Sequence, residues 1–132
     1  MDWNPSGQII LVRALEFTVA LGGETTPTLP AKPGKGGRNQ HYVALTLELL
    51  ANYPGDWVAA SVGTDGSDYL PEVAGAIADN HSLRAILEKE PNFHARLENY
   101  DSNTLLSAVD NSLIITGSTH TNVGDIILYL LS

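Results

Sequence analysis

The chain has 132 residues, of which 43% are hydrophobic and 17% are charged, and its formal net charge is −8. A chain of this length forms one domain with a single core. A negative surface repels nucleic-acid phosphates and anionic lipid, so we expect neither as a partner. Cysteine is absent, which excludes disulfides and thiolate metal sites. No apolar run approaches the roughly 20 residues that cross a bilayer, and the N-terminus lacks a signal-peptide pattern, so we expect a cytoplasmic protein.

The first third of the sequence predicts short extended segments followed by a break. Residues 8–21 read as two short strands that end at the pair Gly22-Gly23. The threonine-rich stretch after this pair is compatible with a strand, but Pro27 restricts it to an edge. The chain thus divides into an N-terminal extension that can add a strand, residues 1–18, and the domain itself, residues 19–132.

The rest of the sequence alternates helix and strand patterns. The clearest helix covers residues 38–52, where the apolar arc is wide enough to be covered on more than one side. Residues 57–63, WVAASVG, form an apolar run without alternation, which is typical of a parallel strand buried on both faces. The remaining predicted elements are helices at 73–80, 83–90, 92–99 and 103–109, and strands at 112–117 and 123–131. This order predicts an α/β fold, a single three-layer α/β/α domain with a mostly parallel or mixed sheet.

Three polar turns rich in glycine each follow a predicted strand. They are GGETT at residues 22–26, GTDGSD at 63–68 and TGSTHTNVGD at 116–125. In an open α/β sheet, ligands bind beyond the carboxyl ends of the strands, where such turns meet. If the strands are parallel, the three turns gather on one rim and form a site. Taken singly, each is an ordinary turn.

The loop GKGGRNQ, residues 34–40, stands directly before the long helix and has the features of an anion-binding loop. The backbone N–H groups around Gly36 and Gly37 can approach phosphate oxygens, and a helix start adds positive partial charge. Arg38 can clamp a carboxylate or phosphate with its planar guanidinium, or it can form a surface ion pair. The loop matches neither G-x-G-x-x-G nor a Walker A sequence. We interpret it as an anion-facing loop rather than a connector.

Acidic and hydroxyl side chains occupy the other turns. Asp65, Asp68 and Asp125 are hard oxygen donors of the kind that hold Mg²⁺. Phosphoryl transfer asks mainly for such positioning and charge neutralisation. The alternative reading of these aspartates is turn formation and helix capping. Hydroxyls suited to a sugar acid or phosphate are present at Thr64, Ser118, Thr119 and Thr121.

Taken in order, the motifs GGETT, GKGGRNQ, TDGSD, AGAIAD, DS and TGSTHTNVGD resemble the MOFRL family. This family is the C-terminal domain of glycerate kinases that form 2-phosphoglycerate, some of which are labelled hydroxypyruvate reductases. The resemblance runs from about Val19 to Leu131. It implies a larger N-terminal α/β domain as partner, with the active site in the cleft between the two domains. It also implies ATP as the phosphoryl donor, Mg²⁺ as cofactor and D-glycerate as the small anionic substrate.

The resemblance further implies which residues face that cleft. Arg38 and Asp65 would be catalytic, with Arg38 at the substrate carboxylate or the transferring phosphoryl group. Asp65 and Asp125 would position Mg²⁺ or fix the loops. The residues implied to bind substrate or phosphate are Gly36, Gly37, Asn39, Thr121 and Asn122.

Two family patterns are altered in this chain. The usual TDGxDGPT is TDGSDYLP here, so Tyr69 takes the place of the second glycine. The usual TGPTGTNVND is TGSTHTNVGD, in which His120 replaces a glycine and Gly124 an asparagine. Because lost glycines are expected to narrow the backbone's approach to phosphate, these loops would be re-tuned or inactive.

Three functional hypotheses follow from the sequence. In the first, the chain is one half of a glycerate kinase whose N-terminal domain lies on another chain, and alone it is inactive because water fills half a cleft. In the second, it is a stand-alone, non-catalytic anion-binding or oligomeric module. In the third, it is a truncated frame that merely folds. A domain without its partner exposes apolar surface, so we also expect a homo-oligomer.

Overall fold

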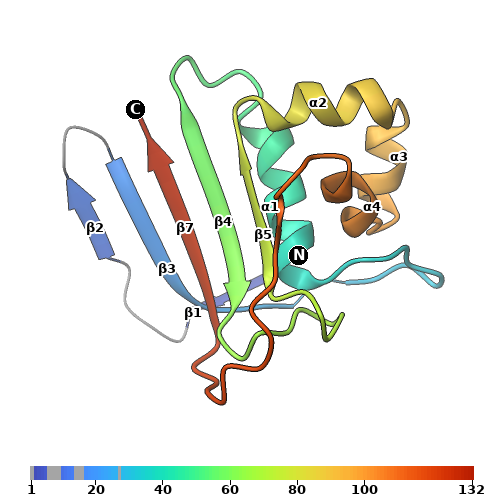
Figure 1. The fold of residues 1–132 in the computed structure, drawn as a ribbon. Coiled ribbons are helices and arrows are strands. Elements are labelled where there is room, and N and C mark those ends of the chain that lie inside the picture. The colour runs from blue at the N-terminus through green and yellow to red at the C-terminus, as the bar shows by residue number, and fades with distance from the viewer. Residues whose placement is uncertain (1, 6–9, 14–16, 27) are drawn as a thin grey trace.

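The computed structural model describes residues 2–5, 10–13, 17–26 and 28–132. These residues form one sheet with helices packed beside it (Figure 1). The strands are β1 (Asp2–Pro5), β2 (Ile10–Arg13), β3 (Phe17–Thr26), β4 (Trp57–Gly63), β5 (Gly75–Asp79), β6 (Leu113–Ile114) and β7 (Asp125–Leu131). The helices are α1 (Arg38–Leu49), α2 (Ser82–Lys89), α3 (Phe93–Glu98) and α4 (Ser102–Ser107). Within the described ranges, no helix is long and apolar enough to cross a membrane.

The sheet is antiparallel, so the prediction of a mostly parallel or mixed sheet is wrong. Its strand order is β1-β3-β7-β4-β5-β6, with β2 also paired to β3, and each described pair is antiparallel. The misleading signal is the non-alternating run of β4. Its burial does alternate, because Trp57, Ala59 and Ser61 are buried while the residues between them are half-buried. An apolar run shows that both faces are apolar, but it does not show what covers each face.

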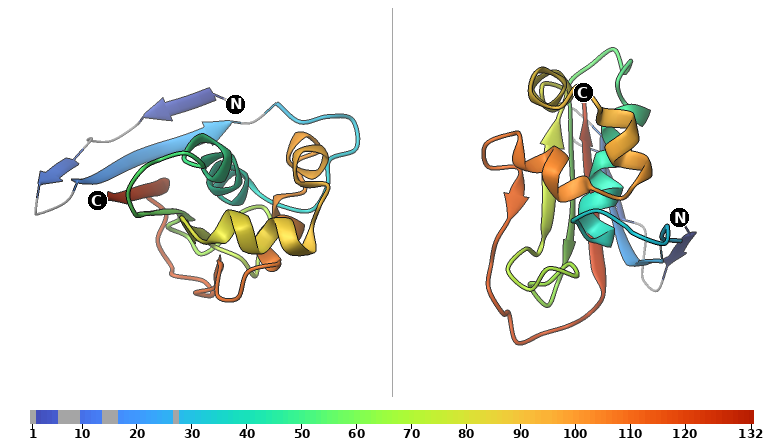
Figure 2. Two further views of the ribbon diagram at one scale, coloured as in Figure 1. Left: turned by 90° about the horizontal axis from the view of Figure 1, so that it is seen from above. Right: turned by 90° about the vertical axis from the view of Figure 1, so that its right-hand side faces the viewer.

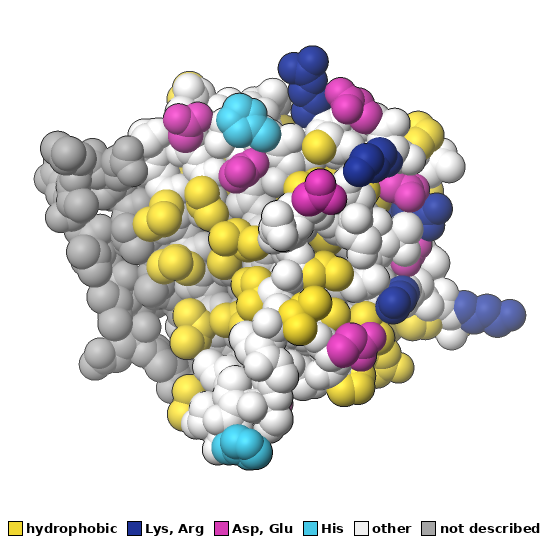
Figure 3. Space-filling view, in the orientation of Figure 1, with side chains coloured by type: hydrophobic (Ala, Val, Ile, Leu, Met, Phe, Trp, Pro, Cys, Tyr) yellow, Lys and Arg dark blue, Asp and Glu magenta, His cyan; other side chains and the backbone are white. Residues whose placement is uncertain are grey.

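The helices pack on one face of the sheet, which gives two layers where the sequence predicted three. Helix α1 lies against β4 and β5, and the other helices pack along one side of it (Figure 2). The core between them contains Val43, Ala44, Leu47, Trp57, Ala59, Ala76, Ala78, Ile86, Phe93, Leu97, Leu105 and Leu106. The opposite face is apolar yet uncovered by the described chain (Figure 3), with Ile77, Ile126 and Leu130 exposed by 38%, 44% and 39%.

Most predicted elements are confirmed, and the helix predicted at residues 73–80 is wrong. The helices α1 to α4 and the strands β4 and β7 form where the pattern placed them, whereas the strand expected at 112–117 shrinks to β6. Residues 75–79 form β5 although alanine favours helices. Ala76 and Ala78 are buried in the core under α1, and a Cβ on Gly75 would lie 1.9 Å from the Ser61 carbonyl oxygen. Small residues are needed here because helix and sheet approach closely.

Candidate functional site

Two of the three predicted glycine-rich turns meet the last half of β3 at one edge of the sheet, although the strands are not parallel. The turn predicted at residues 22–26 is wrong, because these residues continue β3 and pair with β1 and β7. Strands β3 and β4 flank β7 and both run opposite to it, so their ends lie beside the start of β7 (Figure 1). In the register, Gly23 and Gly63 are both paired with Asp125. Thr64 joins the turns further, since its N–H and Oγ1 donate to the Gly124 carbonyl over 3.1 and 2.8 Å. The common rim therefore exists, and antiparallel pairing builds it.

Arg38 and Asp125 form a two-pronged ion pair at this edge. The Arg38 Nε donates to Asp125 Oδ2 and Nη2 donates to Oδ1, each over 2.7 Å. The Asp125 side chain is fully buried, whereas that of Arg38 keeps 27% of its surface exposed. Two parallel charge-assisted hydrogen bonds offset the cost of removing a carboxylate from water and fix the guanidinium plane. Two residues that the sequence assigned to different roles are thus adjacent, and Asp125 orients Arg38.

The start of α1 is occupied by a carboxylate of the protein itself. Asp68 Oδ1 accepts hydrogen bonds from the Asn39 N–H and Nδ2 over 2.8 and 3.1 Å. Asp68 Oδ2 accepts from the Gln40 N–H and Nε2 over 2.8 and 3.2 Å. The Asp68 residue is fully buried, and its charge faces the positive end of the helix dipole. The helix N–H groups that the sequence offered to an external anion are therefore used inside the fold.

A polar network extends from this carboxylate and explains the glycines of the loop. Asn39 Oδ1 accepts from the Ser61 hydroxyl over 2.6 Å, which ties α1 to β4. A Cβ on Gly37 would lie 2.0 Å from the Asp68 carbonyl oxygen, and one on Gly36 would lie 2.2 Å from Ser102 Oγ. The loop needs glycine because it closes tightly on its neighbours, in addition to any role in phosphate approach.

A pocket of about 310 Å³ opens beside Arg38. Its lining combines the loop backbone, one guanidinium and several apolar side chains: Leu29, Pro33, Gly34, Gly36, Gly37, Arg38, Tyr69 and Tyr100. Three of the predicted site residues, Gly36, Gly37 and Arg38, are thus brought together at a hollow. Its volume lies at the small end of the range for small-molecule pockets.

The other predicted site residues do not line this pocket. Asp65 Oδ1 accepts from the Ser67 N–H over 3.0 Å, which is a local turn contact. Asn39 is buried in the network around Asp68. Thr121 and Asn122 lie in the exposed loop before β7, where Asn122 Oδ1 accepts from the Gly124 N–H over 3.1 Å.

The described residues do not fit a magnesium ion held by this chain alone. Within the described ranges, no three His, Asp or Glu side chains are grouped to hold a metal ion. Both oxygens of Asp125 face the guanidinium of Arg38, and Asp65 is engaged in its own turn. Mg²⁺ prefers a site with near-octahedral oxygen ligands, which these two carboxylates do not form.

His41 supports the pocket from behind and is missing from the sequence-based site. Its ring stacks on that of Tyr100, with centroids 3.9 Å apart and an interplanar angle of 18°. His41 is buried, and its Nδ1 has no hydrogen-bond partner among the described residues. Burial therefore lowers the pKa of His41 to about 4, so the ring is neutral at pH 7. The tyrosines were also missed, because neither stands at a recognisable ligand spacing.

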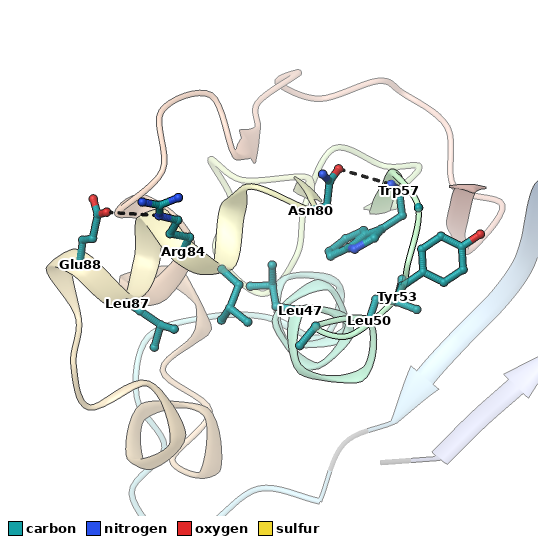
Figure 4. Close-up of a pocket in the computed structure, with 11 residues that line it drawn as sticks. Leu47, Leu50, Tyr53, Trp57, Asn80, Arg84, Leu87 and Glu88 are labelled. Carbon is teal, nitrogen blue, oxygen red and sulfur yellow. Dashed lines mark hydrogen bonds and ion pairs between the residues drawn. The ribbon is translucent and has the colours of Figure 1, made fainter. Parts of the chain in front are cut away.

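A larger hollow of about 650 Å³ lies at the other end of α1 (Figure 4). Leucines of α1 and α2, among them Leu47 and Leu87, line it together with Trp57. Its charged lining residues are Arg84 and Glu88, which pair with each other over 3.8 Å on the exposed surface. No predicted site residue lies here, so the chemistry favours the smaller pocket.

Comparison with known proteins agrees with the resemblance seen in the sequence. The MOFRL family is matched over residues 17–125. A putative hydroxypyruvate reductase of Agrobacterium vitis is 40% identical over 106 residues, 80% of this chain and 27% of that protein. A D-glycerate 2-kinase of Thermotoga maritima is 35% identical over 121 residues, 90% of this chain and 28% of that protein.

A solved structure matches the fold as well. The crystal structure of a glycerate kinase from Thermotoga maritima has a TM-score of 0.78 and 33% identity, covering 87% of this chain and 27% of that one. The chain thus spans about a quarter of the length of the curated relatives it matches.

Proposed function

The chain belongs to the MOFRL family, and we propose that it forms one side of the substrate cleft of a glycerate kinase. The reaction would transfer a phosphoryl group from ATP to glycerate, giving 2-phosphoglycerate. The observation that carries this proposal is the Arg38–Asp125 pair beside a pocket, within a domain that superimposes on part of a glycerate kinase. Isolated, the chain would be inactive, because one side of a cleft leaves the reacting groups in water.

Arg38 would bind the substrate carboxylate or the transferring phosphoryl group. It lines the pocket while Asp125 holds its guanidinium from behind, so the donors are oriented before a ligand arrives. The ion pair is electrically neutral, so a bound anion gains from a further positive charge. Lys35 in the same loop is exposed and carries such a charge.

The nucleotide and Mg²⁺ are proposed from the kinase relatives. Both Asp125 oxygens are paired with Arg38 and the described residues include no group of three ligands, so we assign the metal to the nucleotide instead of to Asp65 and Asp125. Mg²⁺ commonly keeps several waters and is bound through substrate phosphates. Asp65, Thr121 and Asn122 would then shape the rim of the cleft, which Thr64 and Gly124 hold together.

The uncovered sheet face is proposed as the contact surface for a glycerate-kinase N-terminal domain, on the same or another chain. Its apolar positions are Val58, Ala60, Val62, Ile77, Ile126, Leu128 and Leu130. An apolar sheet face is normally buried against another layer. The relatives carry roughly three quarters of their length outside the matched region, which supplies that layer.

The first experiment is reconstitution of activity. This chain is mixed with the separately produced N-terminal domain of the Thermotoga maritima enzyme, and ADP release is measured with ATP, glycerate and Mg²⁺. We expect activity only in the mixture. An Arg38→Lys variant should lose about 100-fold in activity, because lysine keeps the charge but lacks the two parallel N–H donors of the guanidinium. Arg84→Lys is the matched control, since Arg84 is 89% exposed on α2. Full activity of folded Arg38→Lys would contradict the assigned role.

The second experiment tests the contact surface. Ile126→Glu places a charge on the uncovered face, and Leu87→Glu places the same charge on α2, where Leu87 is 46% exposed. We expect Ile126→Glu alone to abolish co-elution with the N-terminal domain. Self-association of the chain through Ile126 would instead assign this face to a second copy.

A stand-alone anion-binding module is the second candidate function. The observation in its favour is that the pocket beside Arg38 is lined by this chain alone. Titration with glycerate and inorganic phosphate distinguishes the two functions. A module binds them without a partner and shows no activity in the reconstituted mixture, and Arg38→Ala abolishes its binding.

A further inference from the structure

Two tyrosines with left-handed backbone conformations line the pocket beside Arg38. Tyr69 has φ +64° and Tyr100 has φ +57°. In the described ranges, the other non-glycine residues with positive φ are Asn111 and His120. A left-handed tyrosine is strained by its Cβ, and such residues persist where the surrounding structure or a function requires them. Both bulky cases occur at one hollow.

The fold accounts for Tyr100 but not for the side chain of Tyr69. Tyr100 stacks on His41 and so contributes to the packing behind the pocket. Tyr69 is 82% exposed. Its backbone sits at the tip of a tight turn in which the Leu70 N–H donates to the Asp68 carbonyl over 2.7 Å. Asp68 is itself locked to α1, so the turn places the Tyr69 ring at the mouth of the pocket.

The pocket has two chemically different parts. Leu29, Pro33 and the two tyrosines provide apolar and aromatic surface, whereas Arg38 and the glycine backbone provide polar surface. A ligand that uses both parts has a flat apolar portion joined to an anionic portion. Glycerate has three carbons and no flat portion, so it would leave the aromatic surface unused.

We propose that Tyr69 makes this pocket a subsite for a nucleoside phosphate, with the base against the tyrosines and the phosphate toward Arg38. This inference rests on the proposed function. A glycerate kinase has two substrates, and the inference assigns one of them, the nucleotide, to this pocket. Every base has a π-face, so stacking on a tyrosine ring stabilises it without a hydrogen-bond code. Arg38 is the charged side chain among the residues that line the pocket, so the phosphate is assigned to its side.

The test compares AMP with tripolyphosphate, which carries charge but no ring. Each is titrated into the wild-type chain, and affinity is measured by NMR chemical-shift changes. We expect Tyr69→Gly to weaken AMP binding about tenfold and to leave tripolyphosphate binding unchanged, while Tyr69→Phe keeps both affinities. Because glycine accepts the left-handed conformation better than tyrosine, Tyr69→Gly is expected to stay folded, so loss of binding does not reflect unfolding.

The matched control is Asn111→Gly, which replaces another exposed residue with φ +59° away from the pocket. It should leave AMP affinity unchanged. Unaltered AMP affinity in Tyr69→Gly, or AMP binding no tighter than that of ribose 5-phosphate, would overturn the inference. The inference would also be overturned if Tyr69→Gly lost binding to the N-terminal domain but kept its AMP affinity, since Tyr69 would then be a protein contact. If reconstitution of kinase activity failed but AMP binding still depended on Tyr69, only the proposed kinase function would be refuted.

Discussion

The two ends of helix α1 have different surroundings, one polar and one apolar. At its N-terminal end, buried Asp68 and Asp125 are paired with donors, and a pocket of about 310 Å³ opens beside Arg38. At its C-terminal end, leucines and Trp57 surround a larger hollow of about 650 Å³ with little polar chemistry (Figure 4). We therefore base the proposed site on the arrangement of buried charge and not on the size of the hollow.

The difference also shows what each end contributes to stability. At the polar end, each carboxylate oxygen of Asp68 and Asp125 accepts a hydrogen bond. A partly satisfied network there would cost more than an apolar one. The apolar end is stabilised mainly by burial, with Leu47 fully buried and Trp57 3% exposed. Substitutions at the two ends should therefore differ in size and kind.

Removal of the Asp68 carboxylate should have the largest effect. Asp68→Ala leaves two helix N–H groups and two side-chain amides without their acceptor, so we expect a loss of about 4 kcal/mol in the free energy of unfolding. Urea denaturation followed by circular dichroism measures this loss. Asp65→Ala is the control, because it removes one local contact, and should cost less than about 1 kcal/mol. Equal losses in the two variants would contradict the central role of Asp68.

Leu47→Ala should come next and should affect stability only. Leu47 of α1 is fully buried in the core. The cavity left by its truncation should lower the free energy of unfolding by about 3 kcal/mol. Leu87→Ala, on the exposed side of the same hollow, should cost well under 1 kcal/mol. Under conditions where the variant is folded, AMP binding at the other end should equal that of the wild type. A change in AMP affinity would show that the two ends of α1 are energetically coupled, and would contradict their separate roles.

Titration of His41 should give the polar end an acid-sensitive stability. Burial lowers the pKa of His41 to about 4 from its ordinary 6.5, so between these values the unfolded chain binds more protons than the folded chain. The free energy of unfolding should therefore fall by about 2 kcal/mol from pH 7 to pH 5, and stay constant in this respect above pH 7. His41→Gln should remove this slope, whereas His81→Gln, at an exposed histidine, should retain it.

Tyr69→Gly should give the smallest effect, and in the opposite direction. Relief of the left-handed conformation at φ +64° should raise the free energy of unfolding by about 1 kcal/mol, partly offset by the entropy of glycine in the unfolded chain. Thermal denaturation would detect the gain. A clear loss of stability would mean that the Tyr69 ring packs within the fold, and would remove the reason to assign it to a ligand.

The sequence by itself determined the local elements and the family. The period of residues 38–52 sufficed for α1, the apolar runs sufficed for β4 and β7, and the order of the glycine motifs sufficed for the MOFRL resemblance. It singled out Arg38 and Asp125 as candidate site residues, but their pairing over 2.7 Å is visible only in the structure. These signals are local, because periodicity and glycine preferences act over a few residues.

Tertiary structure decided the rest. Strand direction, the uncovered sheet face and the strand at residues 75–79 depend on pairing and packing between distant segments, which an apolar run does not encode. Whether an aspartate meets a metal, an arginine or a helix start is set by distances between such segments. Asp68 became the acceptor of helix α1 and Asp125 the partner of Arg38 because the fold brought those donors within about 3 Å, the range of a hydrogen bond.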